Sequence, residues 1–426
     1  MPATQLRGTI TPPGDKSISH RAAIFNAISS GQAIVEGFQQ GADCKSTLRC
    51  LQALGVSSSL DEQGTLKIKG VGGHGLAEPS TVLSCGNSGT TIRILTGLLA
   101  GQPFHSVLTG DASIRSRPMG RVIEPLTQMG ANIAAREGCT KAPISISGGG
   151  LKGMSYEMPV ASAQVKTALL VAGLYADGET SVTEPATTRD HTERMLQAMG
   201  ADISFGDGPR ITIRPSQRDL SSLSLRVPGD ISSAAPWLVL GAIHLDAEIR
   251  LEGVCVNPTR TGIIDALQAM GADLQLEEER TWGAEPVADI VVRSSKLNGT
   301  AIGGNLVPRA IDELPLIALA ACFAEGETVI TEASELRLKE SDRIKTTATE
   351  LRRMGADIEE RPDGLVVRGP TPLGAATVSS HRDHRIAMML GAAGAVADGQ
   401  TIIRAAEAVA VSYPRFWQDY AQLTRR

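Results

Sequence analysis

The chain has 426 residues, a net charge of −5 and only 3% aromatic residues. A net negative charge argues against a general nucleic-acid binder, which is normally basic, and the longest apolar run, residues 314–324, is too short to span a bilayer. Six cysteines without a CxxC pair favour reduced thiols. We therefore expect a cytoplasmic protein of two or three domains, with neither nucleic acid nor a membrane as its partner.

One short phrase occurs six times along the chain, at intervals of 70, 77, 69, 79 and 73 residues. In each copy an Ala/Leu-rich stretch leads into Gly-Gln, Gly-Glu or a relative, and a β-branched run follows in most copies. A period of this length indicates a repeat architecture. The copies are centred on Gly31, Gly101, Gly178, Ala247, Gly326 and Gly399.

A second pattern runs in phase with the first and predicts a helix in most units. Apolar residues at i, i+4 and i+7 are typical of an amphipathic helix, and the glycine that follows predicts a helix end with positive φ. Alternating residues such as 201–205 and 210–214 then predict strands. Each unit therefore reads helix, strand, helix, strand, strand. The helix-ending pattern occurs at residues 51–55, 126–130, 196–200, 267–271 and 351–355.

The sixth unit stops before its closing strands. Residues 6–17 resemble residues 223–232, because both contain a strand, a Pro-Gly-Asp turn and a Ser at a helix start. We expect the first strand to complete the sixth unit, so that 1–15 plus 229–426 form one lobe and 16–228 form the other. Two lobes joined by two crossings make a cleft that closes on a ligand; an open stack of six units is the alternative.

The residues before the first helix of each unit are polar or charged. Helix N-termini bind anions, because they present unpaired N–H groups and a partial positive charge. Lys16, Arg21, Arg93 and Arg385 lie in these segments and suit a ligand with more than one phosphate or carboxylate. Ordinary helix capping is the alternative for any single residue. The segments are 13–21, 85–93, 159–166, 228–233, 309–315 and 381–385.

Two further loops, 114–120 with Arg117 and 336–343, add basic residues at helix entrances. A solvated surface is the alternative for such mixed charge. The carboxylates best placed to act as general bases are Asp312, Glu313 and Glu340.

Two motif matches are set aside. Residues 70–75 match GxGxxG but do not lead into a helix, so we expect no dinucleotide site. His381 and His384 lack further ligands in the sequence, so we expect no metal.

With these motifs the sequence resembles the EPSP synthase family of enolpyruvyl transferases over essentially its whole length. The resemblance implies an α/β (α+β) fold of two similar lobes, each an inside-out α/β barrel of three βαβαββ units, with the active site in the cleft between them. The matching segments are PGDKSISHR (13–21), GNSGTTIR (86–93), SRPMGR (116–121), SAQVK (162–166), LKESDR (338–343), DHRIAM (383–388) and YPRFW (413–417).

The resemblance implies transfer of the enolpyruvyl group of phosphoenolpyruvate to the 5-hydroxyl of shikimate 3-phosphate, by addition and elimination, in the biosynthesis of chorismate and aromatic amino acids. It implies no metal and no organic cofactor. By motif, shikimate 3-phosphate would be held by Lys16, Ser17, Arg21, Ser162, Ala163, Gln164, Arg189, Asp312 and Lys339. Phosphoenolpyruvate would be held by Lys16, Asn87, Gly89, Arg117, Gln164, Arg343 and Arg385. Asp312 would take the hydroxyl proton, and Glu340 and Lys16 would move protons at the methylene and the intermediate.

The chain departs from the family at several positions. Val411 stands where many members have Lys, Ala163 where a second Ser is common, and Glu335 where Asn is common. Such variants resemble a subgroup less sensitive to glyphosate, whereas Gly89 keeps the space that this inhibitor needs. Sensitivity to glyphosate stays open, and we expect a monomer.

Two alternatives remain. The sister family that acts on UDP-N-acetylglucosamine carries a reactive Cys in a loop that here, at residues 110–114, has none. A non-catalytic anion-binding relative would not require Asp312 or Glu340.

Overall fold

The computed structural model describes residues 5–206, 208–215 and 218–424, which fall into two compact units. One unit contains Gly14–Val227 with Trp282–Ala284, and the other contains the remaining described residues. Residues 1–4 and 425–426, the ends of the predicted C-terminal lobe, lie outside the described residues. The predicted lobes, 16–228 and 1–15 plus 229–426, stay a prediction.

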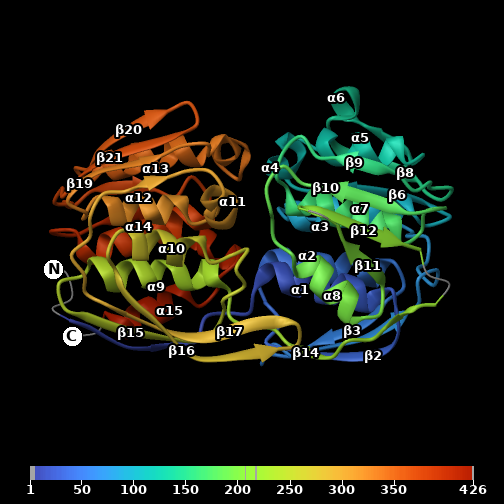
Figure 1. Cartoon of the computed structure of the whole chain (residues 1–426), viewed down its shortest axis with the longest axis horizontal. Helices are drawn as coiled ribbons and strands as arrows, with labels where there is room; N and C mark the ends of the chain where they lie inside the picture. The colour runs from blue at the N-terminus through green and yellow to red at the C-terminus, as the bar shows by residue number, and fades with distance from the viewer. Residues whose placement is uncertain (1–4, 207, 216–217, 425–426) are drawn as a thin grey trace. The chain divides into compact units, whose positions relative to one another are not determined.

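The unit of residues 14–227, blue to green in Figure 1, contains three sheets of the same strand order. In each sheet an edge strand pairs parallel with its neighbour, and the next two pairings are antiparallel: β13-β2-β4-β3, β5-β6-β8-β7 and β9-β10-β12-β11, with β14 also on β2. The strands are β2 (Ser29–Glu36), β3 (Ser57–Leu60), β4 (Leu66–Val71), β5 (Leu83–Ser84), β6 (His105–Thr109), β7 (Asn132–Ala135), β8 (Lys141–Ser147), β9 (Ser155–Glu157), β10 (Thr180–Thr183), β11 (Asp202–Phe205), β12 (Arg210–Arg214), β13 (Leu220–Ser221) and β14 (Leu225–Arg226).

The other unit repeats this order in the sheets β1-β15-β17-β16 and β18-β19-β21-β20, whereas its third sheet has only the parallel pair β22-β23. Its strands are β1 (Leu6–Ile10), β15 (Ala247–Cys255), β16 (Asp273–Trp282), β17 (Glu285–Arg293), β18 (Ala301–Ile302), β19 (Gly326–Ile330), β20 (Asp357–Arg361), β21 (Gly364–Gly369), β22 (Thr377–Ser379) and β23 (Ile402–Arg404).

The predicted place of the first strand was wrong. β1 pairs parallel with β15 of the fourth repeat, from Leu6 opposite Ala247 to Ile10 opposite Leu251, and not with the sixth repeat. Its counterpart β14 pairs in the same way with β2 of the first repeat. The likeness of residues 6–17 and 223–232 therefore identified equivalent strands, but an edge strand's sequence does not specify which sheet it joins.

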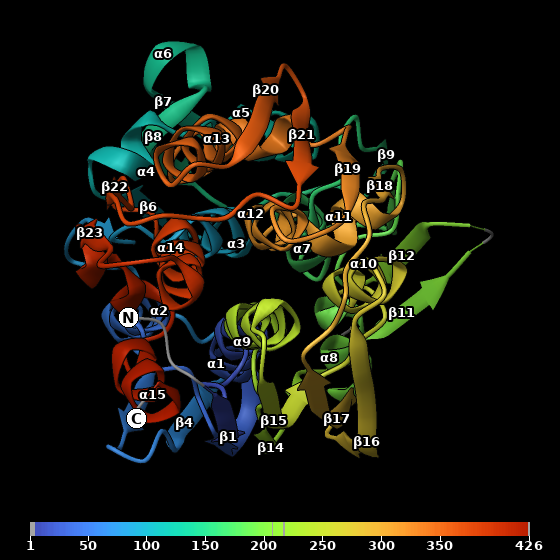
Figure 2. The same cartoon turned by 90° about the vertical axis from the view of Figure 1, so that its left-hand side faces the viewer.

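Each unit has three central helices that are buried along nearly their whole length, and most of them are strongly apolar, as expected for helices covered on every side. The close approach of α3 to α7 depends on Gly97, where an added Cβ would lie 2.2 Å from the Ala168 carbonyl oxygen. Figure 2 shows α9 against the sheet that contains β1 and β15. The central helices are α1 (Lys16–Ala27), α3 (Gly89–Ala100) and α7 (Ala163–Gly173) in one unit, and α9 (Ile231–Ile243), α12 (Leu314–Ala321) and α14 (His384–Val396) in the other.

The amphipathic helices end as predicted. The glycines that follow them have positive φ, for example +88° at Gly55 and +104° at Gly355, which L side chains rarely adopt. The helices that such a glycine follows are α2 (Ala42–Ala53), α5 (Gly120–Gln128), α8 (His191–Ala198), α10 (Gly262–Ala269) and α13 (Arg343–Arg353). In the sixth repeat α15 (Phe416–Leu423) ends at Thr424 instead. Short helices complete the fold: α4 (Ala112–Ser116), α6 (Arg136–Cys139), α11 (Leu306–Ala310), η1 (Ser334–Leu338) and η2 (Ala406–Val411). Within the described ranges, every helix is too short or too polar to cross a bilayer.

Candidate active site

The N-terminus of α1 carries the first group of predicted residues. Asp15 caps the helix by accepting a hydrogen bond from the Ile18 N–H at 2.9 Å, which fixes Lys16 and Ser17 in the first turn. Lys16 Nζ lies 3.1 Å from Asp43 Oδ2, a partner that sequence reasoning missed. Arg189 Nη1 donates to Ser17 Oγ at 3.4 Å, so this predicted residue joins the same group.

Arg21 is buried and forms several hydrogen bonds inside the unit. Its Nε donates to Thr192 Oγ1 at 2.7 Å, its Nη2 to Thr167 Oγ1 at 2.8 Å and its Nη1 to the Ser17 carbonyl at 3.0 Å. These bonds join α1 to α7 and α8. The guanidinium therefore helps to fix the helix that carries Lys16, and its predicted contact with shikimate 3-phosphate stays a prediction.

Two arginines lie at the N-terminus of α3. Arg117 Nη2 donates to Asn87 Oδ1 at 2.7 Å, and Arg93 Nη1 donates to Gln164 Oε1 at 2.6 Å. A Cβ added at Gly89 would lie 2.9 Å from Arg93 Nη1 and 3.2 Å from Arg117 Nη1, so Gly89 borders both guanidiniums. The structure thus brings together predicted residues from three separate segments around one helix N-terminus, the arrangement that binds anions.

The N-terminus of α7 carries the serine segment of the prediction. Ser162 caps this helix, with the Val165 N–H 3.5 Å from its hydroxyl oxygen, and Ala163 and Gln164 form the first turn. Gln164 Nε2 also donates to Thr90 Oγ1 at 3.0 Å, which ties α7 to α3.

Lys166, in the same segment, is buried and paired with carboxylates. Its Nζ lies 2.8 Å from Glu184 Oε2 and 2.6 Å from Glu193 Oε1, and all three side chains are at most 2% exposed. Burial disfavours the ammonium, but the carboxylates of Glu193 and Glu184 outweigh it and raise the pKa of Lys166. Glu184 also accepts a hydrogen bond from the Thr188 hydroxyl. This cation therefore fixes the segment next to Arg189, and sequence reasoning did not identify that role.

The other unit contains an ion cluster around Arg343, the first residue of α13. Arg343 is 1% exposed, and its guanidinium lies 3.0 Å from Asp312 Oδ1, 2.5 Å from Glu340 Oε2 and 2.8 Å from Asp383 Oδ2. Burial opposes the charge, but the carboxylates of Asp383, Glu340 and Asp312 outweigh it and raise the pKa of Arg343. The structure thus unites three predicted residues and adds Asp383, which the sequence identified only as part of a motif.

Asp312 lies beside further cations. Arg385 Nη2 and Lys339 Nζ each lie 4.0 Å from a carboxylate oxygen of Asp312. Arg385 is 6% exposed, and its Nε and Nη1 have no hydrogen-bond acceptor in the described part of the chain. These donors suit an anionic ligand. The neighbouring Glu313 is buried, and this burial raises the pKa of its carboxyl. Asp312 is 13% exposed, so it is the carboxylate of this pair that is able to reach a substrate.

The C-terminal motif contributes packing. Tyr413 and Phe416 are buried against Trp237, with the rings of Trp237 and Phe416 stacked at 5.0 Å. Val411, in η2, supplies no charge at the position where many family members have Lys.

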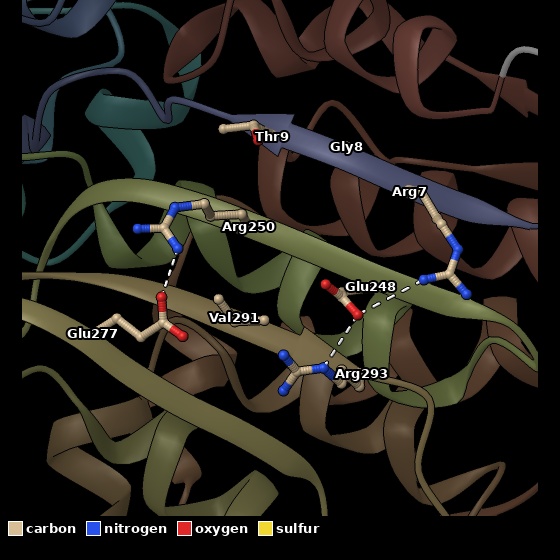
Figure 3. A pocket seen from close by; sticks show the side chains of 8 residues that line it. All are labelled: Arg7, Gly8, Thr9, Glu248, Arg250, Glu277, Val291 and Arg293. Carbon is tan, nitrogen blue, oxygen red and sulfur yellow. Dashed lines mark hydrogen bonds and ion pairs between the residues drawn. The ribbon is translucent and has the colours of Figure 1, made fainter.

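A pocket of about 330 Å³ on the sheet of β1 and β15 is a weaker candidate (Figure 3). Its arginines already face carboxylates: Arg250 Nη1 lies 2.6 Å from Glu277, and Arg293 Nε lies 3.2 Å from Glu248. None of the predicted site residues lines it.

The candidate residues fit anionic ligands better than a metal. They are mainly cations, amides and helix N-termini, which bind phosphate and carboxylate groups. Among residues 5–206, 208–215 and 218–424, no three His, Cys, Asp or Glu side chains are grouped so as to hold a metal ion.

Comparison with known proteins shows a consistent family likeness. Residues 1–420 match the model of the family described as EPSP synthase (3-phosphoshikimate 1-carboxyvinyltransferase). A 3-phosphoshikimate 1-carboxyvinyltransferase of Herpetosiphon aurantiacus is 54% identical over 99% of this chain and 98% of its own length. One from Geobacillus kaustophilus is also 54% identical, over 99% of this chain and 98% of its own length.

Solved structures have the same fold. An EPSP synthase from Acinetobacter baumannii aligns with a TM-score of 0.87 and 47% identity, over 98% of this chain and 95% of its own. The enolpyruvyl transferase NikO from Streptomyces tendae aligns with a TM-score of 0.80 at 18% identity, over 99% and 95%, and so shows the fold alone. These matches confirm the predicted α/β fold class.

Proposed function

We propose that this chain, which belongs to the EPSP synthase family, transfers the enolpyruvyl group of phosphoenolpyruvate to the 5-hydroxyl of shikimate 3-phosphate and releases phosphate. The observation that carries the proposal is the setting of Asp312, a partly exposed carboxylate within 4.0 Å of three cations, Arg343, Arg385 and Lys339. A proton acceptor and anion-binding groups thus lie at one place, as the reaction of two anions requires.

Phosphoenolpyruvate is held by cations and amide donors. Arg385 offers its Nε and Nη1 N–H groups, which have no acceptor among the described residues, and Arg343 joins it beside Asp312. In the other unit Lys16 and Arg117 supply charge. Their fixed hydrogen bonds keep the donors oriented before the ligand arrives, which lowers the cost of binding. The remaining contacts come from Asn87, Gly89 and Gln164.

Shikimate 3-phosphate is held mainly by residues of the unit that contains α1 and α7. The N-terminus of α7 and Arg189 suit its phosphate, because peptide N–H groups and a guanidinium both bind phosphate oxygens. The proposed contacts are Lys16, Ser17, Arg21, Ser162, Ala163, Gln164 and Arg189, with Asp312 and Lys339 at the hydroxyl groups.

The reaction proceeds by addition and elimination. Asp312 takes the proton of the 5-hydroxyl while the hydroxyl oxygen forms a bond to C2 of phosphoenolpyruvate. The electron pair of the double bond takes up a proton at the methylene carbon. In the second step the methyl carbon loses a proton, the double bond re-forms and the C2–O bond to phosphate breaks. Glu340 and Lys16 supply and remove these protons.

Both groups of residues, one in each unit, serve one reaction in this proposal. The cleft between two lobes that the sequence predicts stays part of the proposal. It follows that losing cations from either group, Arg117 or Arg385, lowers turnover of the same substrate pair.

The test measures phosphate release from phosphoenolpyruvate with shikimate 3-phosphate, with UDP-N-acetylglucosamine and with no acceptor. We expect release with shikimate 3-phosphate alone. Release only with UDP-N-acetylglucosamine would identify the sister activity, and binding of both anions without any release would identify a non-catalytic relative.

Glyphosate carries a carboxylate and a phosphonate, so we propose that it competes with phosphoenolpyruvate for the same cations. Gly89 supports this because an added Cβ would lie 2.9 Å from Arg93 Nη1 and 3.2 Å from Arg117 Nη1, so only a residue without a Cβ keeps these cations unobstructed. We also propose a monomer, since every proposed contact comes from one chain. A cytoplasmic location is supported by six free cysteines, five of them buried.

A further inference from the structure

A chain of buried hydrogen bonds crosses three helices in the unit of residues 14–227. His20 Nδ1 of α1 lies 2.7 Å from Thr47 Oγ1 of α2, and Thr47 Oγ1 lies 2.7 Å from Thr91 Oγ1 of α3. Thr91 Oγ1 then donates to Ser88 Oγ at 2.7 Å. All four side chains are 0% exposed, so none of them touches a substrate in solution.

The protons in this chain can be counted. Each threonine hydroxyl has one proton, and that of Thr91 goes to Ser88. Thr47 must therefore donate to Thr91, which leaves Thr47 only its lone pairs for His20. It follows that His20 Nδ1 carries a proton and donates it, and that Nε2 of the neutral ring carries none.

The surroundings of His20 agree with this tautomer. Its Nε2 has no hydrogen-bond partner in the described part of the chain, as expected for a ring nitrogen without a proton to donate. Burial lowers the pKa of His20, the positive charges of Lys16 and Arg21 lower it further, and Asp15 opposes them. The ring is therefore neutral at pH 7.

The two ends of this hydrogen-bond chain, His20 and Ser88, lie next to proposed substrate-binding residues. His20 follows Lys16 by one helical turn. Ser88 caps α3 by accepting the Thr91 N–H at 3.1 Å, and its neighbours Asn87 and Gly89 border Arg117. The chain thus ties the start of α1 to the start of α3.

We propose that His20 is a positioning residue that, through Thr47 and Thr91, holds the segment 86–89 where it binds phosphoenolpyruvate. This inference rests on the proposed function. It gives a role to a histidine that lies within a substrate-binding motif but contacts no substrate.

The first experiment is performed on the parent protein. The ¹⁵N chemical shifts of the His20 ring, assigned by comparison with His20→Asn, report which nitrogen carries the proton. We expect the Nδ1–H tautomer. The Nε2–H tautomer would overturn the hydrogen-bond chain whether or not the protein is an active transferase.

The second experiment compares KM for phosphoenolpyruvate among variants. His20→Leu and Thr91→Val interrupt the chain and should raise KM about tenfold, the effect of one buried hydrogen bond, with kcat changed less than about threefold. His20→Asn keeps an N–H donor near the place of Nδ1 and should stay within about threefold of the parent. The matched control is Thr96→Val, because the Thr96 hydroxyl donates to the Ile92 carbonyl of its own helix at 2.7 Å and, among the described residues, forms no bond to another helix.

The outcomes separate the two proposals. A parent protein without phosphate release refutes the proposed function. In that case the tautomer of the His20 ring still tests the hydrogen-bond chain. An active parent with equal KM values for His20→Leu, His20→Asn and the parent refutes the positioning role. Equal losses in Thr96→Val and Thr91→Val would also refute it, since they would show a general effect of packing.

Discussion

Replacing Asp312 by Asn removes one charge from the ion cluster but keeps an oxygen that accepts the hydrogen bond of Arg343, 3.0 Å away. Arg343 also keeps Glu340 at 2.5 Å and Asp383 at 2.8 Å, so it stays in place to bind an anion. Substrate affinity should therefore change less than about threefold. Loss of a general base lowers kcat by about 10²- to 10⁴-fold, or about 2.7–5.5 kcal/mol of transition-state free energy.

The assay is steady-state phosphate release, combined with calorimetric titration of shikimate 3-phosphate. Asp265→Asn is the matched control, because Asp265 is a half-buried carboxylate of the same unit, 2.7 Å from Arg309 and outside the cluster. This control should keep the kcat of the parent. A loss of kcat smaller than about tenfold in Asp312→Asn, or an equal loss of affinity, would refute the role of Asp312 as the base.

Three further predictions concern other parts of the chain. Gly89→Ala places a Cβ 2.9 Å from Arg93 Nη1, so KM for phosphoenolpyruvate should rise about tenfold while the thermal midpoint stays unchanged; an unchanged KM would contradict this. Lys166→Met leaves two buried glutamates without their cation and should cost about 3–5 kcal/mol in urea unfolding, against the expectation of less than about 1 kcal/mol for a surface lysine. Burial holds the pKa of His20 well below its ordinary value of 6.5. As the pH falls below 6.5, this histidine therefore binds a proton in the unfolded state before it does so in the native state. The stability that the neutral ring contributes is therefore present above about pH 6.5 and is lost as the pH falls below that value, which urea unfolding measured at a series of pH values should show; His20→Asn should lack this loss.

Much of the fold was predictable because its signals are local. The glycines after the amphipathic helices indicated helix ends, and the alternating residues at 201–205 and 210–214 predicted the strands observed at 202–205 and 210–214. The partner of β1 was not predictable, because its pairing with β15 joins residues about 240 positions apart, where only tertiary packing decides.

The candidate site likewise contains residues that the sequence predicted and residues that it did not. Lys16 and Arg385 could be predicted because each is a cation at the start of a helix. A cation there is unfavourable to the helix dipole, so its presence indicates a function. The partners that hold these cations in place were not signalled. Asp43, Glu184 and Glu193 pair with Lys16 or Lys166 from other elements, and their side chains look like ordinary surface carboxylates until the fold buries them.

The central claim is transfer by addition and elimination, and the most direct test is to run the reaction in D₂O with phosphoenolpyruvate and shikimate 3-phosphate. Addition turns the methylene into a methyl group with one solvent deuteron, and elimination removes one of its three hydrogens. We therefore predict deuterium in the vinyl group of the product by proton NMR, together with one phosphate released per product formed. A product without deuterium at that carbon, formed with the same release of phosphate, would contradict the account.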